Sequence, residues 1–412
     1  MTKWKSLRIP LCSRLGVLDT TLHLSRRAAL LKPTAVNSIL ADIRQVQARG
    51  RTVISLMRGE PDFETPAHIV DAAAAAMKAG RTRYPDNRGE KPLRQAIAAK
   101  LTRDNGLSHD ADSEILVTTG ATLGIHAALT ALVDEGDEVL LPDPIYDAYQ
   151  SPILLCGGRI RSVRSTIEQG RFAFRPEAIE AALTPTSRVL LLNTPWNPVG
   201  TVLREDELRA IGEVVVRRNL VLISDEIYEA ITYDGARHIS PAILSDELRA
   251  RTVIINSLSK TYAMTGWRVG YCAAPAPIIE RMFLALQQSS RGPATFVQDA
   301  ATAAITGPQD CVGSMRDEYA ARRQLVLTTL ADVPGVRVLA PEGGFFAMLD
   351  VRQAGVASNE IRQRLLNDHG VAVVHGAAYG PAGEGTLRVS FGSGGDTLVR
   401  GLALLRDGLR AL

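Results

Sequence analysis

Residues 257–268 have the sequence Ser-Leu-Ser-Lys-Thr-Tyr-Ala-Met-Thr-Gly-Trp-Arg, and they directly follow the apolar run Thr-Val-Ile-Ile-Asn at 252–256. Lys260 therefore stands among small polar residues at the end of an expected strand, with Arg268 at the start of the next. A lysine amine in such a place can form a Schiff base and later shuttle a proton, once neighbouring positive charge lowers its pKa. The hydroxyls and Arg268 suit a phosphate dianion. The alternative is a solvated loop lysine.

Outward from this stretch, short apolar runs alternate with longer amphipathic ones from about residue 114. We expect strands at 115–118, 138–141, 188–193, 220–224, 252–256 and 268–272, with helices at 121–133 and 204–218. Strands that are apolar on both faces and are separated by helices predict a mostly parallel sheet covered on both sides. Ligands of such sheets lie beyond the carboxyl ends of the strands.

The pattern changes after about residue 295, where long helices (295–306, 309–331) precede short strands (336–339, 345–349, 385–391) and helices at 358–369 and up to 410. This predicts a smaller α+β domain, joined by an N-terminal helix at 36–49. The predicted division is an N-terminal extension at 1–25, a small domain from 26–61 and 296–412, and a large cofactor-binding domain at 62–295.

The composition is that of a globular enzyme. The 412 residues are 46% hydrophobic and carry a net charge of +3, with acidic and basic residues mixed, so nucleic acid is not an expected partner. No apolar run approaches the ~20 residues of a membrane-spanning helix. The basic segment 1–27 is interpreted as an extension or an upstream start, with a transit peptide as the alternative. The four cysteines form no CxxC or zinc-ligand pair, so we predict no metal site and reduced thiols in a cytoplasmic protein; they are Cys12, Cys156, Cys272 and Cys311.

A second motif is Ile-Ser-Asp-Glu-Ile-Tyr at 223–228. Asp225 directly follows an apolar strand, where a carboxylate needs a cationic or hydrogen-bonding partner. A protonated pyridine nitrogen would serve, because the carboxylate keeps such a ring cationic and electron-accepting. Tyr228 can point the same way, toward the ring's phenolic oxygen. The alternative is that Asp225 caps a helix beginning at Glu226.

Two weaker motifs end neighbouring strands. The turn Asn-Thr-Pro-Trp-Asn-Pro-Val-Gly at 193–200 is made rigid by its prolines and can hold Asn197 near the same phenolic oxygen. The sequence Thr-Thr-Gly-Ala-Thr at 118–122 leads from a strand into a helix, whose amino end can receive a phosphate. Each is equally compatible with an ordinary turn.

Together these motifs resemble the class I/II aminotransferases, the aspartate aminotransferase superfamily of fold type I, over nearly the whole chain from about residue 22. The resemblance implies an α/β fold with a seven-stranded large-domain sheet, pyridoxal 5'-phosphate (PLP) as cofactor, and a homodimer with shared active sites. It implies that Lys260 forms the Schiff base, that Asp225 pairs with the pyridine nitrogen, and that Asn197 and Tyr228 bind the phenolic oxygen. The implied phosphate-binding residues are Gly120, Ala121, Thr122, Ser257 and Arg268.

The same resemblance implies four further roles. Tyr146 would stack on the pyridine ring, Tyr84 would reach a phosphate across the dimer interface, Arg388 would grip the substrate α-carboxylate, and the Gly59 backbone would line the substrate side. The tyrosines, including Tyr149, are otherwise ordinary packed aromatics, and Arg388 is otherwise a strand-surface arginine.

Some residues depart from the family pattern. Arg58 either turns into the pocket to recognise an acidic side chain or is a solvated charge, and we favour the second reading. Thr122 stands where some acidic-substrate relatives carry a lysine, which argues against aspartate as the favoured donor. Phe345 and Phe346 are expected to add apolar surface near the substrate.

The function implied is ping-pong transamination between an L-amino acid and a 2-oxo acid. A PLP-dependent carbon–sulfur β-lyase and a non-catalytic PLP-binding module are the alternatives, because the cofactor carries chemistry that they share. A dehydrogenase is disfavoured, since no GxGxxG motif opens a strand–turn–helix unit.

Overall fold

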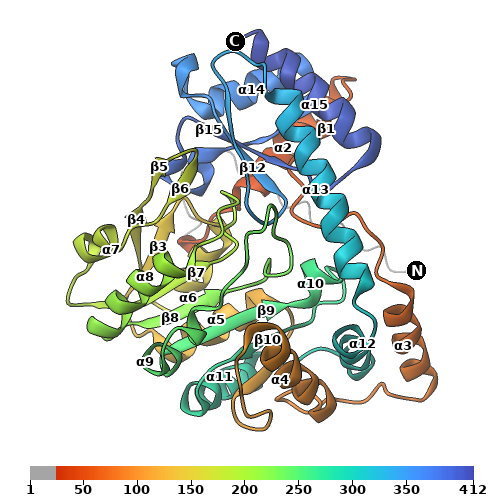
Figure 1. Cartoon of the computed structure of the whole chain (residues 1–412), viewed down its shortest axis with the longest axis vertical. Coiled ribbons are helices and arrows are strands. Elements are labelled where there is room, and N and C mark those ends of the chain that lie inside the picture. The colour runs from red at the N-terminus through yellow and green to blue at the C-terminus, as the bar shows by residue number, and fades with distance from the viewer. Residues whose placement is uncertain (1–24) are drawn as a thin grey trace, which may run out of the picture.

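The structure, a computed structural model, describes residues 25–412. All of the predicted extension except Ser25, and with it Cys12, lies outside these residues. In Figure 1 the large sheet and its helices fill the lower part of the view, and the smaller sheet and its helices fill the upper part. This is the arrangement expected for an α/β chain with a second α+β domain. Within residues 25–412, no helix has the length and apolar character needed to cross a bilayer.

The large sheet has seven strands in the order β2-β10-β9-β8-β7-β3-β4. They are β2 (Ile115–Thr118), β3 (Glu138–Asp143), β4 (Arg159–Arg164), β7 (Ser187–Asn193), β8 (Val221–Asp225), β9 (Thr252–Ser257) and β10 (Gly270–Ala273). Only β10 runs antiparallel to its neighbours, β9 and β2, and all other pairings are parallel. The prediction of a mostly parallel sheet is confirmed.

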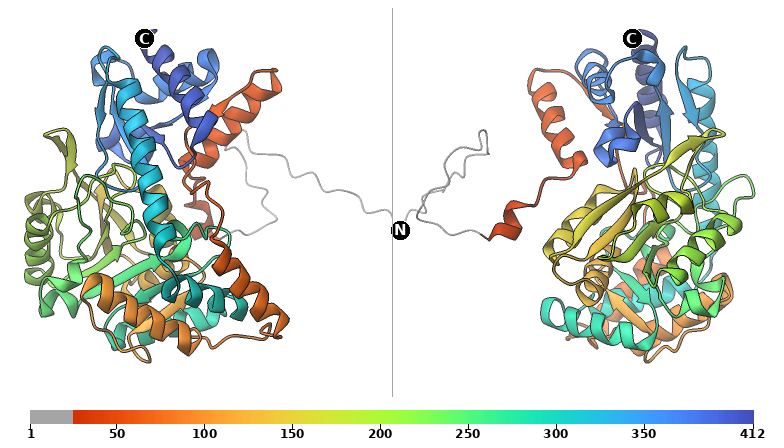
Figure 2. Two further views of the ribbon diagram at one scale, coloured as in Figure 1. Left: turned by 45° about the vertical axis from the view of Figure 1, so that its right-hand side comes forward. Right: turned by 90° about the vertical axis from the view of Figure 1, so that its left-hand side faces the viewer.

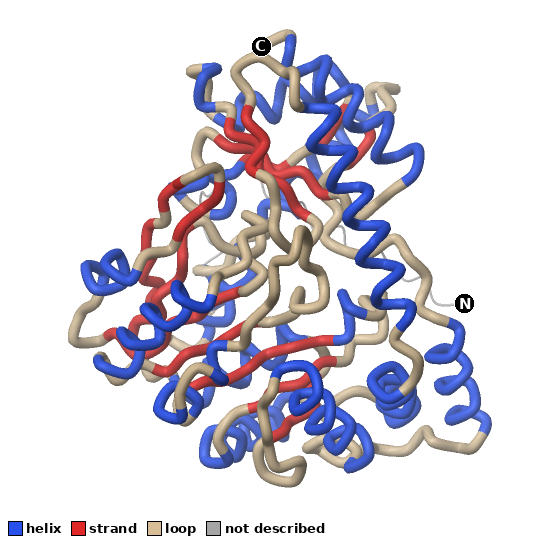
Figure 3. The backbone as a smooth tube through the Cα atoms, in the orientation of Figure 1, coloured by secondary structure: helices blue, strands red, loops and turns tan. Residues whose placement is uncertain are grey.

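Apolar side chains of successive residues point to opposite faces of this sheet, as in Leu190 and Leu191 of β7, which lie in different core clusters. One face is covered by α5 (Ala121–Leu132), α6 (Gln150–Leu155) and α11 (Ala276–Ser289). The other is covered by α7 (Pro176–Ala182), α8 (Glu205–Arg217) and α9 (Asp246–Arg249) at one end, and by α4 (Lys91–Asn105) and α12 (Thr295–Thr306) at the other. Helix α3 (Ala67–Lys78) packs on α12. Figure 3 shows these helices around the strands.

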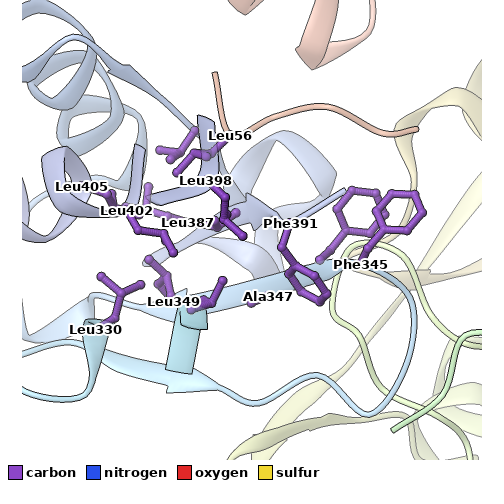
Figure 4. Packing of buried hydrophobic residues seen from close by; sticks show 14 of the residues in the cluster. Leu56, Leu330, Phe345, Ala347, Leu349, Leu387, Phe391, Leu398, Leu402 and Leu405 are labelled. Carbon is purple, nitrogen blue, oxygen red and sulfur yellow. The ribbon is translucent and has the colours of Figure 1, made fainter. Parts of the chain in front are cut away.

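The smaller sheet is antiparallel, in the order β11-β12-β15-β14. Its strands are β11 (Arg337–Leu339), β12 (Phe346–Asp350), β14 (Val374–His375) and β15 (Thr386–Ser390), and β1 (Ile54–Ser55) pairs separately with β13 (Val371–Ala372). Helices α13 (Asp310–Leu330), α14 (Ser358–His369) and α15 (Gly395–Arg410) cover it. Figure 4 shows leucines of α15 packed against Leu349 and Leu387 of the sheet. Figure 2 shows α1 (Arg26–Ala29) and α2 (Ala35–Ala48) along one side of the molecule.

Several parts of the chain differ from expectation; helices α4 and α11 and strand β14, for example, have no counterpart among the predicted elements. Arg268 does not begin the last strand of the large sheet: its φ of 56° is left-handed, so β10 starts only at Gly270. The edge strand β4 was missed because it is rich in arginine rather than apolar. The hairpin of β5 (Thr166–Glu168) and β6 (Arg171–Ala173) was also missed. Other element ends agree to within one or two residues.

Candidate active site

A cavity of about 500 Å³ lies at the edge where the parallel strands β7, β8 and β9 end. Polar residues at or just after these ends line it: Asn197, Asp225 and Ser257. The start of α5 and, from β15 of the smaller sheet, Arg388 complete the walls. All of the residues predicted for the site line this cavity except Gly120 and Tyr84.

Lys260 lies in the short helix α10 (Leu258–Thr261), and its Nζ donates a hydrogen bond to the carbonyl oxygen of Gly59 at 2.7 Å. Burial lowers the pKa of Lys260 to about 8, with help from Arg268 and against the carboxylates of Glu60 and Asp225. The unprotonated fraction of the amine near neutral pH is therefore larger than that of an ordinary lysine, which favours a role as nucleophile or proton carrier.

Asp225, the last residue of β8, is buried and holds two hydrogen bonds. Tyr149 Oη donates to its Oδ2 at 2.5 Å, and the Ile227 amide donates to its Oδ1 at 3.2 Å. Burial raises the pKa of Asp225 to about 6, and the Tyr149 hydrogen bond opposes this rise. No helix begins at Glu226, where the chain makes turns, so the alternative in which Asp225 caps such a helix is wrong.

Asn197 and Tyr228 meet in the cavity, with Asn197 Nδ2 3.4 Å from Tyr228 Oη. The side chain of Asn193 fixes the turn by accepting the Asn197 amide at 2.7 Å. The Tyr228 ring packs edge-on against Phe345 and Phe346, and burial raises the pKa of its hydroxyl well above the usual value. Tyr228 is therefore held as a neutral hydrogen-bonding group.

Arg388 is 2% exposed. Its Nη2 donates to the Met57 carbonyl at 3.0 Å and its Nη1 to Asn197 Oδ1 at 3.3 Å, and the guanidinium stacks on Phe346 at 4.3 Å. Its buried Nε has no partner, and no carboxylate among residues 25–412 forms an ion pair with it. A buried guanidinium without a counter-ion is costly, so this geometry favours a ligand carboxylate.

The turn into α5 forms a cradle beside Arg268. Gly120 has φ of 80°, and a Cβ there would lie 2.4 Å from Arg268 Nη2, so glycine is what allows the arginine to approach. Ala121 and Thr122 occupy the first turn of α5, whose free amides and dipole favour an anion. Ser257 Oγ, which accepts the Ser259 amide at 3.1 Å, lies on the cavity wall. These groups fit a phosphate.

Tyr146 lines the cavity, with its ring 5.5 Å from that of Tyr149 and nearly perpendicular to it. Tyr84 lies outside the cavity of its own chain, is 82% exposed, and has the Arg291 guanidinium 5.1 Å from its ring. Its predicted role requires a second subunit and stays a prediction.

The residues that depart from the family pattern are also placed. The half-exposed Arg58 side chain pairs with Glu60 at 2.9 Å and does not line the cavity, in agreement with the solvated reading. Thr122 and Phe346 line the cavity, whereas Phe345 does not line it but has its ring 5.9 Å from Lys260 Nζ.

Several lining residues carried no signal in the sequence. Thr34, Val36 and Asn37, at the start of α2, close one wall beside Met57. They carry no motif, and they come from a part of the chain distant in sequence from the motifs at 118–268. Asp147 and Ser259 could have been noticed, since each adjoins a predicted residue.

Away from the cavity, Glu226, Glu229 and His238 lie close enough together for a metal. Their carboxylates are already satisfied by protein groups: Lys100 and Asn256 bind Glu229, while Ser224 and Ser240 bind Glu226. The arrangement is that of a buried hydrogen-bond network.

The fold and the cavity define the class of protein: an α/β chain with a cavity at the edge of its large sheet, lined by Lys260, Arg268 and Arg388. Comparison with known proteins gives the family. The family model "Aminotransferase class I and II" matches residues 51–402. An aspartate aminotransferase from Geobacillus stearothermophilus is 38% identical, covering 92% of this chain and 96% of that protein. An arginine–pyruvate transaminase from Pseudomonas aeruginosa is 39% identical, covering 88% and 90% respectively.

Solved structures agree. The aspartate aminotransferase from Rhizobium meliloti superposes with a TM-score of 0.89 at 33% identity, covering 94% of this chain and 99% of that one. The aromatic aminotransferase from Pyrococcus horikoshii OT3 gives a TM-score of 0.85 at 38% identity, covering 90% and 99%. The chain belongs to the class I and II aminotransferase family, and its activity is that of a transaminase. The relatives named here are all aminotransferases, so the β-lyase alternative is not favoured.

Proposed function

We propose that the cavity binds pyridoxal 5'-phosphate and moves an amino group from an L-amino acid to a 2-oxo acid in two half-reactions. The observation that carries this proposal is the convergence of Lys260, Arg268 and Arg388 on one cavity, without an ion pair to any described carboxylate. An amine, a phosphate-binding arginine and a carboxylate-binding arginine match the groups of this cofactor and of an amino acid.

The residues of the cavity suit the parts of the cofactor. Arg268, Ser257 and the first turn of α5 (Gly120, Ala121, Thr122) would hold the phosphate. Asp225 would face the ring nitrogen, Asn197 and Tyr228 the phenolic oxygen, and Tyr146 the ring itself. When bound, the cofactor supplies an aldehyde carbon and an electron-accepting ring.

The protein's own groups would bind the substrate and move the proton. Arg388 holds the α-carboxylate of the amino acid, with the Gly59 backbone and Asn197 on the substrate side. Lys260 Nζ, with a pKa lowered to about 8, would take the α-proton of the amino acid and deliver it to the carbon that comes from the cofactor aldehyde. Arg388 is held by Met57 and Asn197, so the carboxylate has a fixed position relative to Lys260.

An absorbance spectrum of the purified protein with PLP tests this function. We expect L-alanine or L-glutamate to convert the cofactor band to that of the pyridoxamine form, and pyruvate or 2-oxoglutarate to restore it. Release of pyruvate and ammonia from a thioether amino acid would instead indicate the β-lyase. A cofactor band that no amino acid converts would indicate a non-catalytic module, and absence of any band would mean that Lys260 is wrongly assigned.

In the pH profile of kcat/KM, the limb on the acid side is expected to move to higher pH by about one pH unit when Tyr149 is replaced with phenylalanine. Burial raises the pKa of Asp225 to about 6, and the Tyr149 hydroxyl opposes this rise because its hydrogen bond stabilises the ionised carboxylate. Without that donor the pKa of Asp225 rises, so the carboxylate is lost at a higher pH and the ring nitrogen loses its anionic partner. The measurement is the pH profile of kcat/KM for the variant and the wild type.

The matched control is Tyr262→Phe, which removes a buried hydroxyl that bonds Gln309 away from the cavity. In this control variant, the acid limb of the kcat/KM profile should lie at the same pH as in the wild type. A Tyr149→Phe profile that is lower but parallel to the wild type at every pH would show that the hydroxyl acts in some other way.

Assembly, domain bounds and location are also proposed. In a homodimer with shared active sites, the exposed Tyr84 would contact the cofactor phosphate of the other subunit. Analytical ultracentrifugation would measure the oligomeric state. The small domain would comprise 26–61 and 296–412, and the large domain 62–295. A cytoplasmic location is supported by the free thiols of Cys156, Cys272 and Cys311.

A further inference from the structure

Five charged side chains line the cavity: Lys260, Arg268, Arg388, Asp225 and Asp147. The proposed function uses the first four, for the cofactor and for the substrate α-carboxylate. Asp147 is therefore the only charged lining group, within residues 25–412, that has no assigned ligand. Its charge is negative, so it bears on which substrate side chains the cavity accepts.

Asp147 begins a short 3-10 turn directly after Tyr146. Its Oδ2 accepts the Ala35 amide, at the start of α2, at 2.7 Å. Its Oδ1 is buried and has no hydrogen-bond partner among the described residues, and no cation lies within ion-pair distance of the carboxylate. Burial raises the pKa of Asp147, against the Ala35 hydrogen bond, the charge of Arg388 and the nearby backbone amides of Asp147 and Ala148. A donor that reached Oδ1 would remove the cost of this unpaired oxygen.

The wall around Asp147 combines polar and apolar groups. Thr34 and Asn37 line the cavity at the start of α2, where the Thr34 side chain makes no capping bond. Val36 and Met57 add apolar surface on the same side. Such a wall suits a chain of methylene groups that ends in hydrogen-bond donors.

We propose that the amino donor is a basic amino acid, whose cationic side-chain end is bound by Asp147 while its α-carboxylate is bound by Arg388. This inference rests on the proposed function and names its substrate class. A guanidinium fits best, because its planar fork can bond Asp147 Oδ1 and leave donors for Thr34 and Asn37. The donor leaves as the corresponding 2-oxo acid after its amino group has passed to the cofactor.

A dicarboxylic donor fits poorly. Among the groups that this chain itself contributes to the cavity, the three cations are already engaged and the remaining charge is Asp147, so the donor's second carboxylate would meet a like charge. Arg58 pairs with Glu60 outside the lining, so it offers no counter-ion there. Like charges brought together in a partly buried site repel strongly.

The test compares L-arginine with L-citrulline, its neutral isostere, in the first half-reaction of the PLP-loaded enzyme. The measured quantity is the second-order rate constant for conversion of the cofactor band. The same constant is measured for L-alanine, L-aspartate and L-glutamate. We expect arginine to exceed citrulline by about tenfold or more, because a charge-assisted hydrogen bond is lost in citrulline. Aspartate and glutamate should react more slowly than arginine.

Asp147→Asn keeps an acceptor for the Ala35 amide and removes the charge, so the arginine-to-citrulline ratio should fall to about one. Asp147→Glu should keep a ratio above one. Asp332→Asn, which changes an exposed aspartate far from the cavity, should keep the wild-type ratio.

A wild-type ratio near one, or a faster reaction with aspartate or glutamate than with arginine, would overturn the basic-donor inference and leave the transaminase proposal intact. An unchanged ratio in Asp147→Asn would overturn the role of Asp147. Failure of every amino acid, including L-alanine, to convert the cofactor would overturn both this inference and the proposed function. If Asp147→Asn does not fold, the wild-type comparison alone decides the substrate class.

Discussion

Replacing Lys260 with alanine is expected to lower turnover by more than about 10⁴-fold, because one group serves both as the Schiff-base nucleophile and as the proton carrier. PLP should still bind, without a covalent link, since Arg268, Ser257, the first turn of α5 and Asp225 remain. The measurements are steady-state transamination with the best donor of the panel, and equilibrium binding of PLP followed by absorbance. The Schiff-base band should be absent.

Lys78→Ala is the matched control, since Lys78 is an exposed lysine at the end of α3, away from the cavity. It should keep both the turnover and the Schiff-base band of the wild type. Normal turnover in Lys260→Ala would refute the assignment of the catalytic lysine. Loss of PLP binding together with turnover would show that the remaining phosphate groups do not hold the cofactor by themselves.

Replacing Arg388 with lysine is expected to lower kcat/KM for L-alanine by about 100-fold. Lysine keeps the charge but loses the planar fork, which the Met57 carbonyl and Asn197 orient and which Phe346 supports from one face. The substrate carboxylate then has no bidentate partner, so its α-proton is poorly placed for Lys260. The measurement is kcat/KM under steady-state conditions.

The comparison that isolates carboxylate recognition uses ethylamine, which lacks that group. The ratio of kcat/KM for alanine to that for ethylamine should fall in Arg388→Lys and stay constant in Arg410→Lys, an exposed change at the end of α15. Equal losses with both substrates would mean that Arg388 mainly supports the packing between the two sheets.

Much of the fold could be predicted because the inner strands of a parallel sheet are buried on both faces. Strands β7, β8 and β9 are nearly continuous apolar runs for that reason, and their ends were found to within one or two residues. Strand β4 is paired on one side only and carries arginines, so apolar patterning gave no indication of it. The left-handed backbone at Arg268 is equally invisible to patterning, because non-glycine residues rarely adopt it and the apolar period does not mark it.

The residues predicted for the site fall into two groups, those that local sequence indicated and those that only the resemblance to a family indicated. Lys260, Asp225 and Asn197 stand at or just after strand ends, and parallel strands bring such ends to one edge, so local sequence was enough to group them. The assignments of Arg388 and Gly59 came from resemblance to a family. The structure shows their contacts: Arg388 meets Asn197 across 191 residues of sequence, and Lys260 meets Gly59 across 201.

The sequence by itself therefore determined the parallel sheet and the placement of Lys260 and Asp225 at one edge of it, because burial and strand order leave direct marks in local sequence. Only the tertiary structure decided which groups surround the substrate. The start of α2 closes the cavity, Tyr149 is bonded to Asp225, and Asp147 keeps one buried oxygen without a partner. These depend on how separate segments pack, since a hydrogen bond or an unpaired charge exists only once distant side chains share a space that excludes water.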